Sequence, residues 1–138
     1  MRYHIGVDIG SISVNTVIIN EYREILAEFY DYTHGRPFKT LLIRLQQLKE
    51  EWNFNLSTIA FTGTGGRIGA KLLNGVFVNE IIAQAGSVSE LYPEVRTIIE
   101  MGGEDSKLIF LGEDGHSNGL SLADFSMNNL CAAGTGSF

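Results

Sequence analysis

The sequence predicts an α/β fold with a mixed sheet, and three observations carry this prediction. Apolar and polar residues alternate over Tyr3–Ile9 and again over Ser13–Asn20, as they do in half-buried strands joined by a short turn. A helical period of apolar residues begins after Pro37, a residue that the first turn of a helix tolerates. Short apolar runs and helical segments then follow in turn. An antiparallel start followed by this succession is the element order of ribonuclease H-like folds.

The remaining elements of the first half follow the same patterns. We expect a third strand over Glu24–Tyr32, which completes an antiparallel meander, and a buried parallel strand over Leu56–Phe61. The apolar residues that should share one face of the intervening helix are Phe38, Leu41, Leu42, Leu45, Leu48 and Trp52.

Helices and strands also alternate in the second half. Helices are expected over Ile68–Leu73 and Glu80–Leu91, the second ending before Pro93. The strands expected after them are Val95–Met101, a segment near Lys107–Leu111, and Leu120–Ser126.

An internal repeat suggests two lobes. Val7–Ser13 and Ile99–Asp105 both read as an apolar strand that ends in an acidic residue, one further residue, glycine and a small residue. We therefore predict a first ribonuclease H-like lobe over residues 1–95 and the beginning of a second lobe over residues 96–138. The helices of that second lobe are not in the sequence, so we expect it to be truncated.

Composition and charge limit the function classes. The net charge of −6 leaves no basic surface for nucleic acid. A single cysteine, Cys131, excludes an internal disulfide framework, and no apolar run approaches the roughly 20 residues that span a bilayer. We expect a cytoplasmic protein that binds neither nucleic acid nor a membrane.

Two glycine turns are candidates for binding phosphate, because glycine and small residues let backbone N–H groups approach an anion closely. The predicted contacts are Gly10, Ser11 and Ser13 in the first turn and Gly102 and Gly103 in the second. Asp8, at the end of the first strand, is placed to bind Mg²⁺ or its water ligands. Taken singly, each turn is also explained as an ordinary hairpin; the repeated acidic residue favours a shared role in binding a polyphosphate.

Two further segments have both a structural and a functional interpretation. Thr62–Gly66 superficially resembles a dinucleotide-binding turn, but Ile68 stands where the third glycine belongs, so a close-packed turn beneath a nucleotide site is the better interpretation. Glu80, which follows Asn79 at the start of a predicted helix, would either cap that helix or orient a water molecule for attack on a terminal phosphate.

The segment around Cys131 is the most unusual in the chain. A lone cysteine is usually a buried, inert thiol. Here small residues and a Gly-Thr-Gly turn follow it, which suits a thiolate that binds metal in a site shared with another chain. An iron–sulfur cluster generally takes four thiolates, which one thiolate per subunit cannot provide but two from each subunit of a two-fold dimer could.

Three motifs, in order, resemble one family. They are Asp8-Ile9-Gly10-Ser11, then Gly102-Gly103-Glu104-Asp105-Ser106-Lys107, then the segment from Met127-Asn128 through Cys131 to Gly136. The chain resembles the ATPase activators of 2-hydroxyacyl-CoA dehydratases and the ATPase subunits of benzoyl-CoA reductase, the BadF/BadG/BcrA/BcrD-type ATPases. This family belongs to the actin, sugar-kinase and heat-shock-chaperone superfamily, so the resemblance implies an actin-like ATPase fold.

The resemblance also implies a function and a set of site residues. It implies ATP or ADP with Mg²⁺ at the phosphate motifs, with Asp105 and Lys107 in the second motif and Glu80 as the water-orienting residue. It implies a homodimer with one [4Fe–4S] cluster at its two-fold axis, Cys131 being the first of two ligands from each subunit. ATP hydrolysis would drive low-potential electron transfer from a reduced ferredoxin or flavodoxin, through the cluster, to the dehydratase or a related reductase. An N-terminal part that ends at Phe138 is not expected to be active alone.

The sequence departs from the family pattern at several positions, and two other functions stay open. The departures are Asn15 for a frequent lysine, Gln84 for a histidine, Glu100 for aspartate, Glu104 for glutamine, and an additional Gly66. A small-molecule kinase of the same superfamily would share the phosphate turns but has no use for the thiolate. An inactive nucleotide-binding module is compatible with the departures.

Overall fold

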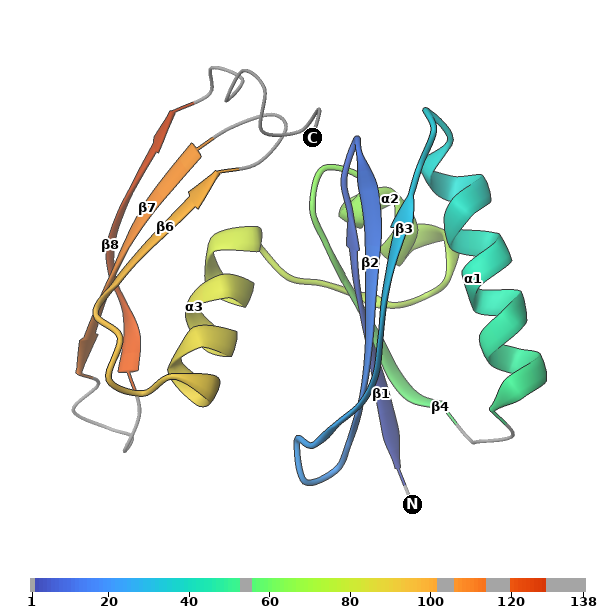
Figure 1. Cartoon of the computed structure of the whole chain (residues 1–138), viewed down its shortest axis with the longest axis horizontal. Coiled ribbons are helices and arrows are strands. Elements are labelled where there is room, and N and C mark those ends of the chain that lie inside the picture. Colours follow the sequence, from blue (N-terminus) through green and yellow to red (C-terminus); the bar gives the residue numbers. More distant parts are fainter. Residues whose placement is uncertain (1, 53–55, 102–105, 114–119, 129–138) are drawn as a thin grey trace. The chain divides into compact units, whose positions relative to one another are not determined.

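A computed structural model describes the chain except for residues 1, 53–55, 102–105, 114–119 and 129–138. It divides into two compact units, Met1–Val78 and Asn79–Phe138 (Figure 1).

The first unit contains a five-stranded mixed sheet with the strand order β3-β2-β1-β4-β5. The strands are β1 (Tyr3–Ile9), β2 (Ser13–Asn20), β3 (Ile25–Tyr32), β4 (Leu56–Thr62) and β5 (Val76–Phe77). β1, β2 and β3 form an antiparallel meander, and β4 is parallel to β1. This is the predicted mixed sheet with an antiparallel start. β5 was not expected, because two residues are too few to show a period of alternation.

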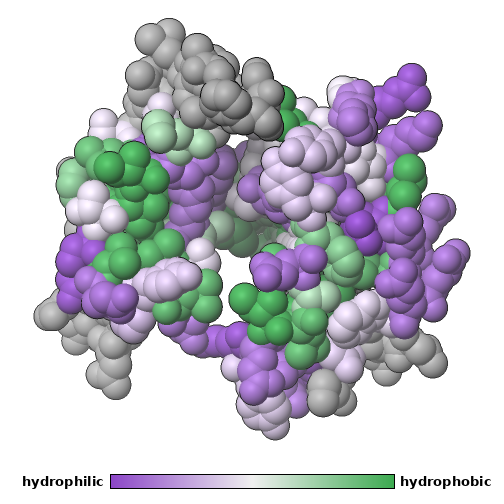
Figure 2. Space-filling model, in the orientation of Figure 1, coloured by the Kyte–Doolittle hydropathy of each residue, from purple (hydrophilic) through white to green (hydrophobic). Residues whose placement is uncertain are grey.

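Two helices, α1 (Pro37–Glu51) and α2 (Gly66–Leu72), contribute to the core on one face of this sheet. The core residues are Ile5, Val7, Ile9, Val14, Ile18, Leu41, Leu48, Phe61 and Ala70. Leu42 is 54% exposed, so its predicted place on the buried face of α1 is wrong. The face of α1 that contacts the core is centred on Leu41 and Leu48. Leu42 comes one residue after Leu41, so its side chain is rotated by about 100° around the helix axis, away from that face. The outward side of α1 is mostly hydrophilic (Figure 2).

A bidentate ion pair fastens α1 to β3. Arg44 donates from Nε and Nη2 to the two carboxylate oxygens of Asp31, at 2.8 Å each, and its guanidinium lies 4.1 Å from the centre of the Phe29 ring. The hydrogen bond from Arg44 lowers the pKa of Asp31 below its ordinary value. The pair is only about one-fifth exposed, so we expect it to contribute more than a typical surface pair.

Replacing Arg44 with methionine is expected to lower the free energy of unfolding by about 1–2 kcal/mol at neutral pH. Because the pKa of Asp31 is depressed in the folded state, the electrostatic contribution is fully present above the ordinary aspartate pKa of about 3.9. It is lost as the pH falls through the lower, folded-state value. Urea denaturation followed by the fluorescence of Trp52, the chain's one tryptophan, measures the effect, because Trp52 packs edge-on against Tyr3 beside the first core.

The matched control for Arg44→Met is Lys39→Met, which removes an exposed cation from the same helix and should change stability little. If the difference between wild type and Arg44→Met stays constant from neutral pH down to about pH 2, the ion pair is not its source. The packing of the guanidinium on Phe29 would then account for the whole effect.

Among its described residues, the second unit has a three-stranded antiparallel sheet with one helix packed on it. The strands are β6 (Thr97–Met101), β7 (Ser106–Glu113) and β8 (Leu120–Asn128), in that order across the sheet. α3 spans Glu80–Leu91, the predicted bounds, and its residues Ile81 and Ala85 form a core with Ile109 and Leu111 of β7. The meander β6-β7-β8 repeats the arrangement of β1-β2-β3. The lobe boundary near residue 96, which was inferred from the sequence repeat, stays a prediction.

Among the described helices, none is both long and apolar enough to cross a membrane.

Candidate nucleotide site

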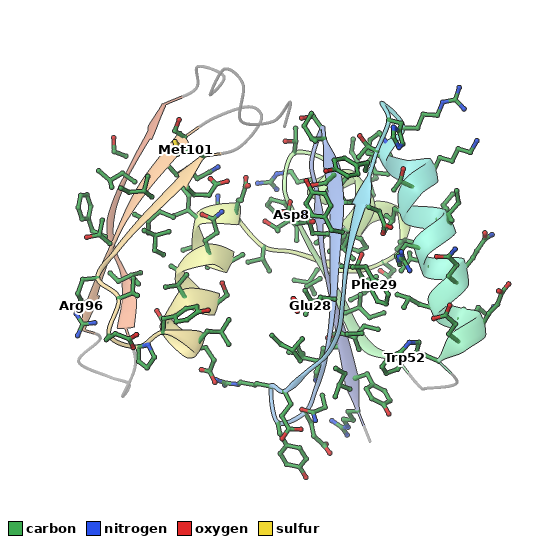
Figure 3. The ribbon with its side chains drawn as sticks, viewed as in Figure 1. Asp8, Glu28, Phe29, Trp52, Arg96 and Met101 are labelled. Atoms are coloured by element: carbon green, nitrogen blue, oxygen red, sulfur yellow. The ribbon has the colours of Figure 1, made fainter. Side chains whose placement is uncertain are left out.

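A row of polar side chains crosses the first sheet at the carboxyl end of β1. Ile9 and Val7 point into the core, so Asp8 lies on the opposite face, at the end of the sheet that carries the β1–β2 turn (Figure 3). Asp8 is paired in register with Asn15 of β2 and with Thr62 of β4, which places all three on the same face. The Asn15 amide donates to the Ser13 hydroxyl at 3.2 Å. The residue that replaces the family's lysine therefore lies directly beside Asp8.

The chemistry of this row fits Mg²⁺ bound together with a polyphosphate. Asp8 supplies a carboxylate, and the Thr62 hydroxyl oxygen is buried without a hydrogen-bond partner among the described residues. The described part of the chain contains no group of three or more His, Cys, Asp or Glu side chains that could hold a metal by themselves. Mg²⁺ bound to a nucleotide needs no such group, because it keeps several waters and takes other ligands from phosphate oxygens.

The β1–β2 turn is arranged by a residue that the sequence analysis did not single out. Thr33 donates from its hydroxyl to the Ser11 carbonyl at 2.6 Å and from its N–H to the Ile12 carbonyl at 2.9 Å. In a trans peptide the N–H points opposite to the carbonyl. The N–H groups of Ile12 and Ser13 are therefore directed away from Thr33. The Gly10 N–H is engaged within the turn, where it donates to the Ser13 carbonyl at 3.0 Å.

Thr33 also joins this turn to α1. Its side chain is buried, and its carbonyl accepts hydrogen bonds from the Arg36 N–H at 2.8 Å and from the Thr40 hydroxyl at 3.4 Å. No local pattern reveals a contact between residues 11 and 33. The available signal was the polar Thr-His-Gly sequence before Pro37, which indicates a turn but not its partner.

The turn Thr62–Gly66 packs tightly against the end of β1, as predicted. Gly65 donates its N–H to the Ile9 carbonyl at 2.9 Å. Gly63 has a φ of +86°, and a Cβ there would collide with the Asp8 carboxylate and lie 2.6 Å from the Ile9 carbonyl oxygen. Gly63 is thus a second residue that the sequence analysis missed as a determinant of the site.

In the second unit, the first turn of α3 brings charged side chains together. The Asn79 side chain caps the helix by accepting from the N–H groups of Ile81, at 2.9 Å, and Ile82, at 3.4 Å. The capping role considered for Glu80 thus belongs to Asn79. Glu80 lies 3.6 Å from the buried Lys107 ammonium, which also contacts Glu100 at 3.0 Å.

Several predicted residues lie outside the described part of the chain, and their roles stay predictions. They are Gly102, Gly103, Asp105 and Cys131. The first three follow Met101, the last residue of β6, in the sequence (Figure 3). Other predicted residues lie within the described part, and their assignment to nucleotide chemistry also stays a prediction. They are Asp8, Gly10, Ser11, Ser13, Glu80 and Lys107.

The fold places the chain among the actin-like ATPases, whose mixed sheet begins with an antiparallel meander. Within that class the chain belongs to the BadF/BadG/BcrA/BcrD ATPase family, which it matches over residues 5–138.

Relatives and solved structures support this assignment. The (R)-2-hydroxyglutaryl-CoA dehydratase activating ATPase of Acidaminococcus fermentans is 30% identical over 99% of this chain and 50% of the relative. The crystal structure of component A of the (R)-2-hydroxyglutaryl-CoA dehydratase of that organism superimposes with a TM-score of 0.81 at 26% identity, covering 99% of this chain and 51% of the other. The activator of the 2-hydroxyisocaproyl-CoA dehydratase from Clostridium difficile, solved with bound ADPNP, gives a TM-score of 0.76 at 30% identity over 98% and 48%. The chain thus spans about half the length of these relatives.

Proposed function

We propose that the protein carrying this chain is an ATP-hydrolysing activator of a 2-hydroxyacyl-CoA dehydratase or a related reductase. The observation that carries the proposal is the similarity of nearly the whole chain to dehydratase activators, one of them solved with ADPNP. The two acyl groups named for these relatives differ, so the proposal is limited to the class of 2-hydroxyacyl-CoA substrates. The relatives favour an activator over a small-molecule kinase or an inactive module.

The first unit would bind the phosphates and their metal ion. The outward N–H groups of the β1–β2 turn suit a phosphate, with the Ser11 and Ser13 hydroxyls beside them. Mg²⁺ would neutralise phosphate charge, with Asp8 holding the ion directly or through a water molecule. Asn15 carries no charge, so the side chain paired with Asp8 in the register does not repel a cation.

The second unit would supply the group that activates water. Glu80 is about one-third exposed at the start of α3, so a ligand can reach its carboxylate. There it would accept a hydrogen bond from a water molecule and align it for in-line attack on the terminal phosphate, giving ADP and inorganic phosphate. Gly102, Gly103 and Asp105 would contribute the second phosphate turn, as expected from their motif.

The electron-transfer role is the finer part of the proposal and rests on the family resemblance. In it, Cys131 is one of two thiolates that each subunit of a homodimer supplies to a shared [4Fe–4S] cluster. A reduced ferredoxin or flavodoxin in the cytoplasm would provide the electron, and hydrolysis of ATP would drive its passage to the dehydratase.

Two measurements on the complete gene product, purified without oxygen, test the two parts of the proposal, the ATP hydrolysis and the iron–sulfur cluster. The protein is expected to hydrolyse ATP only with Mg²⁺, so that EDTA abolishes phosphate release and added Mg²⁺ restores it. It is also expected to be brown, with one oxygen-sensitive cluster per dimer. Cys131→Ala should be colourless while still binding ADPNP.

The outcomes separate the two levels of the proposal. Binding of ADPNP without ATP hydrolysis would reject the ATPase. Hydrolysis by a colourless protein prepared with an adequate iron supply would reject only the cluster. A cluster retained in Cys131→Ala would remove this cysteine from the set of ligands.

A further inference from the structure

We propose that Lys107 is a positioning residue, which holds the Glu80 carboxylate in place at the first turn of α3 and does not itself bind phosphate. The inference rests on the proposed ATP hydrolysis and assigns Lys107 a role different from that of the second phosphate motif to which it belongs. It depends only on residues of the second unit.

The contacts of Lys107 join three elements of that unit. Lys107 on β7 is paired directly across the sheet with Glu100 on β6, so the two side chains lie on the same face. Its ammonium lies 3.0 Å from Glu100 Oε2 and 3.6 Å from Glu80 Oε2 on α3. Two residues further along β7, Ile109 is fully buried in the core formed with Ile81. The cluster of Lys107, Glu80 and Glu100 therefore lies on the same face of the sheet as this apolar core, next to the start of α3.

Burial distinguishes the lysine from its two partners. The side chain of Lys107 is 3% exposed, whereas those of Glu80 and Glu100 are 32% and 27% exposed. A buried ammonium is stable only when it is paired, and the two carboxylates provide the pairing. A ligand approaching from solvent would meet the carboxylates before the ammonium. This arrangement suits a cation that supports a carboxylate from behind, and it is poor for a direct contact with phosphate.

Glu80 is thereby restrained at both ends. Asn79 caps α3 and so fixes the backbone of the residue that follows it. At the other end of the side chain, Lys107 limits where the carboxylate can lie. A catalytic group held in its productive geometry avoids an ordering cost during the reaction, and a displacement of about 1 Å can reduce the rate roughly 10²-fold.

Steady-state ATP hydrolysis by the complete gene product tests the inference with Lys107→Met, which keeps the length and apolar stem of the side chain. We expect kcat to fall by about 30–100-fold while the KM for ATP and the Kd for ADPNP change less than about threefold. The matched control is Lys71→Met, an exposed lysine on α2, for which neither constant should change.

A double variant separates positioning from an independent role. If Lys107 acts through Glu80, then Glu80→Gln combined with Lys107→Met should be no slower than Glu80→Gln alone. If the double variant loses a further 30-fold or so, Lys107 acts independently and the inference is rejected. An increase of about tenfold or more in the Kd for ADPNP with kcat preserved would identify Lys107 as a phosphate ligand, which also rejects it.

Two further measurements keep the inference decidable. If Lys107→Met does not fold, the charge-preserving Lys107→Arg is measured in its place. A fall in kcat with an unchanged KM supports the positioning role, and a weaker Kd for ADPNP with kcat preserved rejects it. If the wild-type protein binds ADPNP but does not hydrolyse ATP, the proposed function fails, and a crystal structure of Lys107→Met then decides the positioning role. A displaced Glu80 carboxylate supports that role, and an unmoved one rejects it.

Discussion

Replacing Glu80 with glutamine is expected to lower kcat for ATP hydrolysis by about 10²–10⁴-fold, with a change in KM of less than about threefold. Glutamine preserves the size of the side chain and a carbonyl oxygen, but it cannot accept a proton from water and carries no charge to align it. That interaction strengthens as the water attacks, so its loss raises the barrier more than it weakens nucleotide binding. Phosphate release under steady-state conditions and ADPNP binding by calorimetry measure the two effects separately.

A purely structural role for Glu80 makes a different prediction. A carboxylate in the first turn of a helix is worth about 0.3–1 kcal/mol through the helix dipole, and Glu80 also faces the buried Lys107. Glu80→Gln would then lower the melting temperature without a selective loss of kcat. Glu90→Gln, an exposed position near the other end of α3, is the matched control for removing one carboxylate from this helix. If Glu80→Gln keeps kcat within about threefold of wild type, the water-orienting role is wrong.

Much of the fold was predictable, because its elements carry strong local signals. Alternation over β1 indicated one face in the core, and the burial of β1 and β2 alternates accordingly, although the buried positions of β2 include the polar Thr16 and Asn20. The bounds of α3 were predicted correctly because Asn79 is a strong capping residue and Pro93 follows the helix closely. Leu42 was misplaced because the three consecutive apolar residues Leu41, Leu42 and Ile43 obscure which side of the helix faces the core.

The site was predictable only where a residue's role follows from its place in an element. Asp8 and Glu80 stand at the end of a strand and at the start of a helix, positions that the sequence alone indicates. Thr33 supports the β1–β2 turn from 22 residues away, and this contact requires the register of β2 with β3. The partners of Lys107 likewise depend on the β6–β7 register and on the packing of α3, which no local pattern encodes.

Replacing Gly63 with alanine is expected to lower the free energy of unfolding by about 2–4 kcal/mol and to reduce Mg²⁺-dependent ATP hydrolysis. Two separate penalties apply at this position. A φ of +86° is unfavourable for any residue with a Cβ, and that Cβ would collide with the Asp8 carboxylate and the Ile9 backbone. The backbone carbonyl cannot move without disturbing β1, so the Asp8 side chain has to turn away from the site. Urea denaturation followed by Trp52 fluorescence measures the first effect, and the Mg²⁺ concentration that gives half-maximal activity measures the second.

Two other glycines of the same unit separate these penalties. Gly35 has a φ of +77° with open space around its Cβ position, so Gly35→Ala should show only the backbone cost of about 1–2 kcal/mol. Gly6, on β1 and on the same face as Asp8, has open space and no positive φ, so Gly6→Ala should be close to neutral. If Gly63→Ala matches Gly35→Ala in stability and requires no more Mg²⁺ than wild type, the contact with Asp8 has no consequence. An increased Mg²⁺ requirement confined to Gly63→Ala would instead connect this turn to the metal through the Asp8 carboxylate, since the other two variants leave that side chain in place.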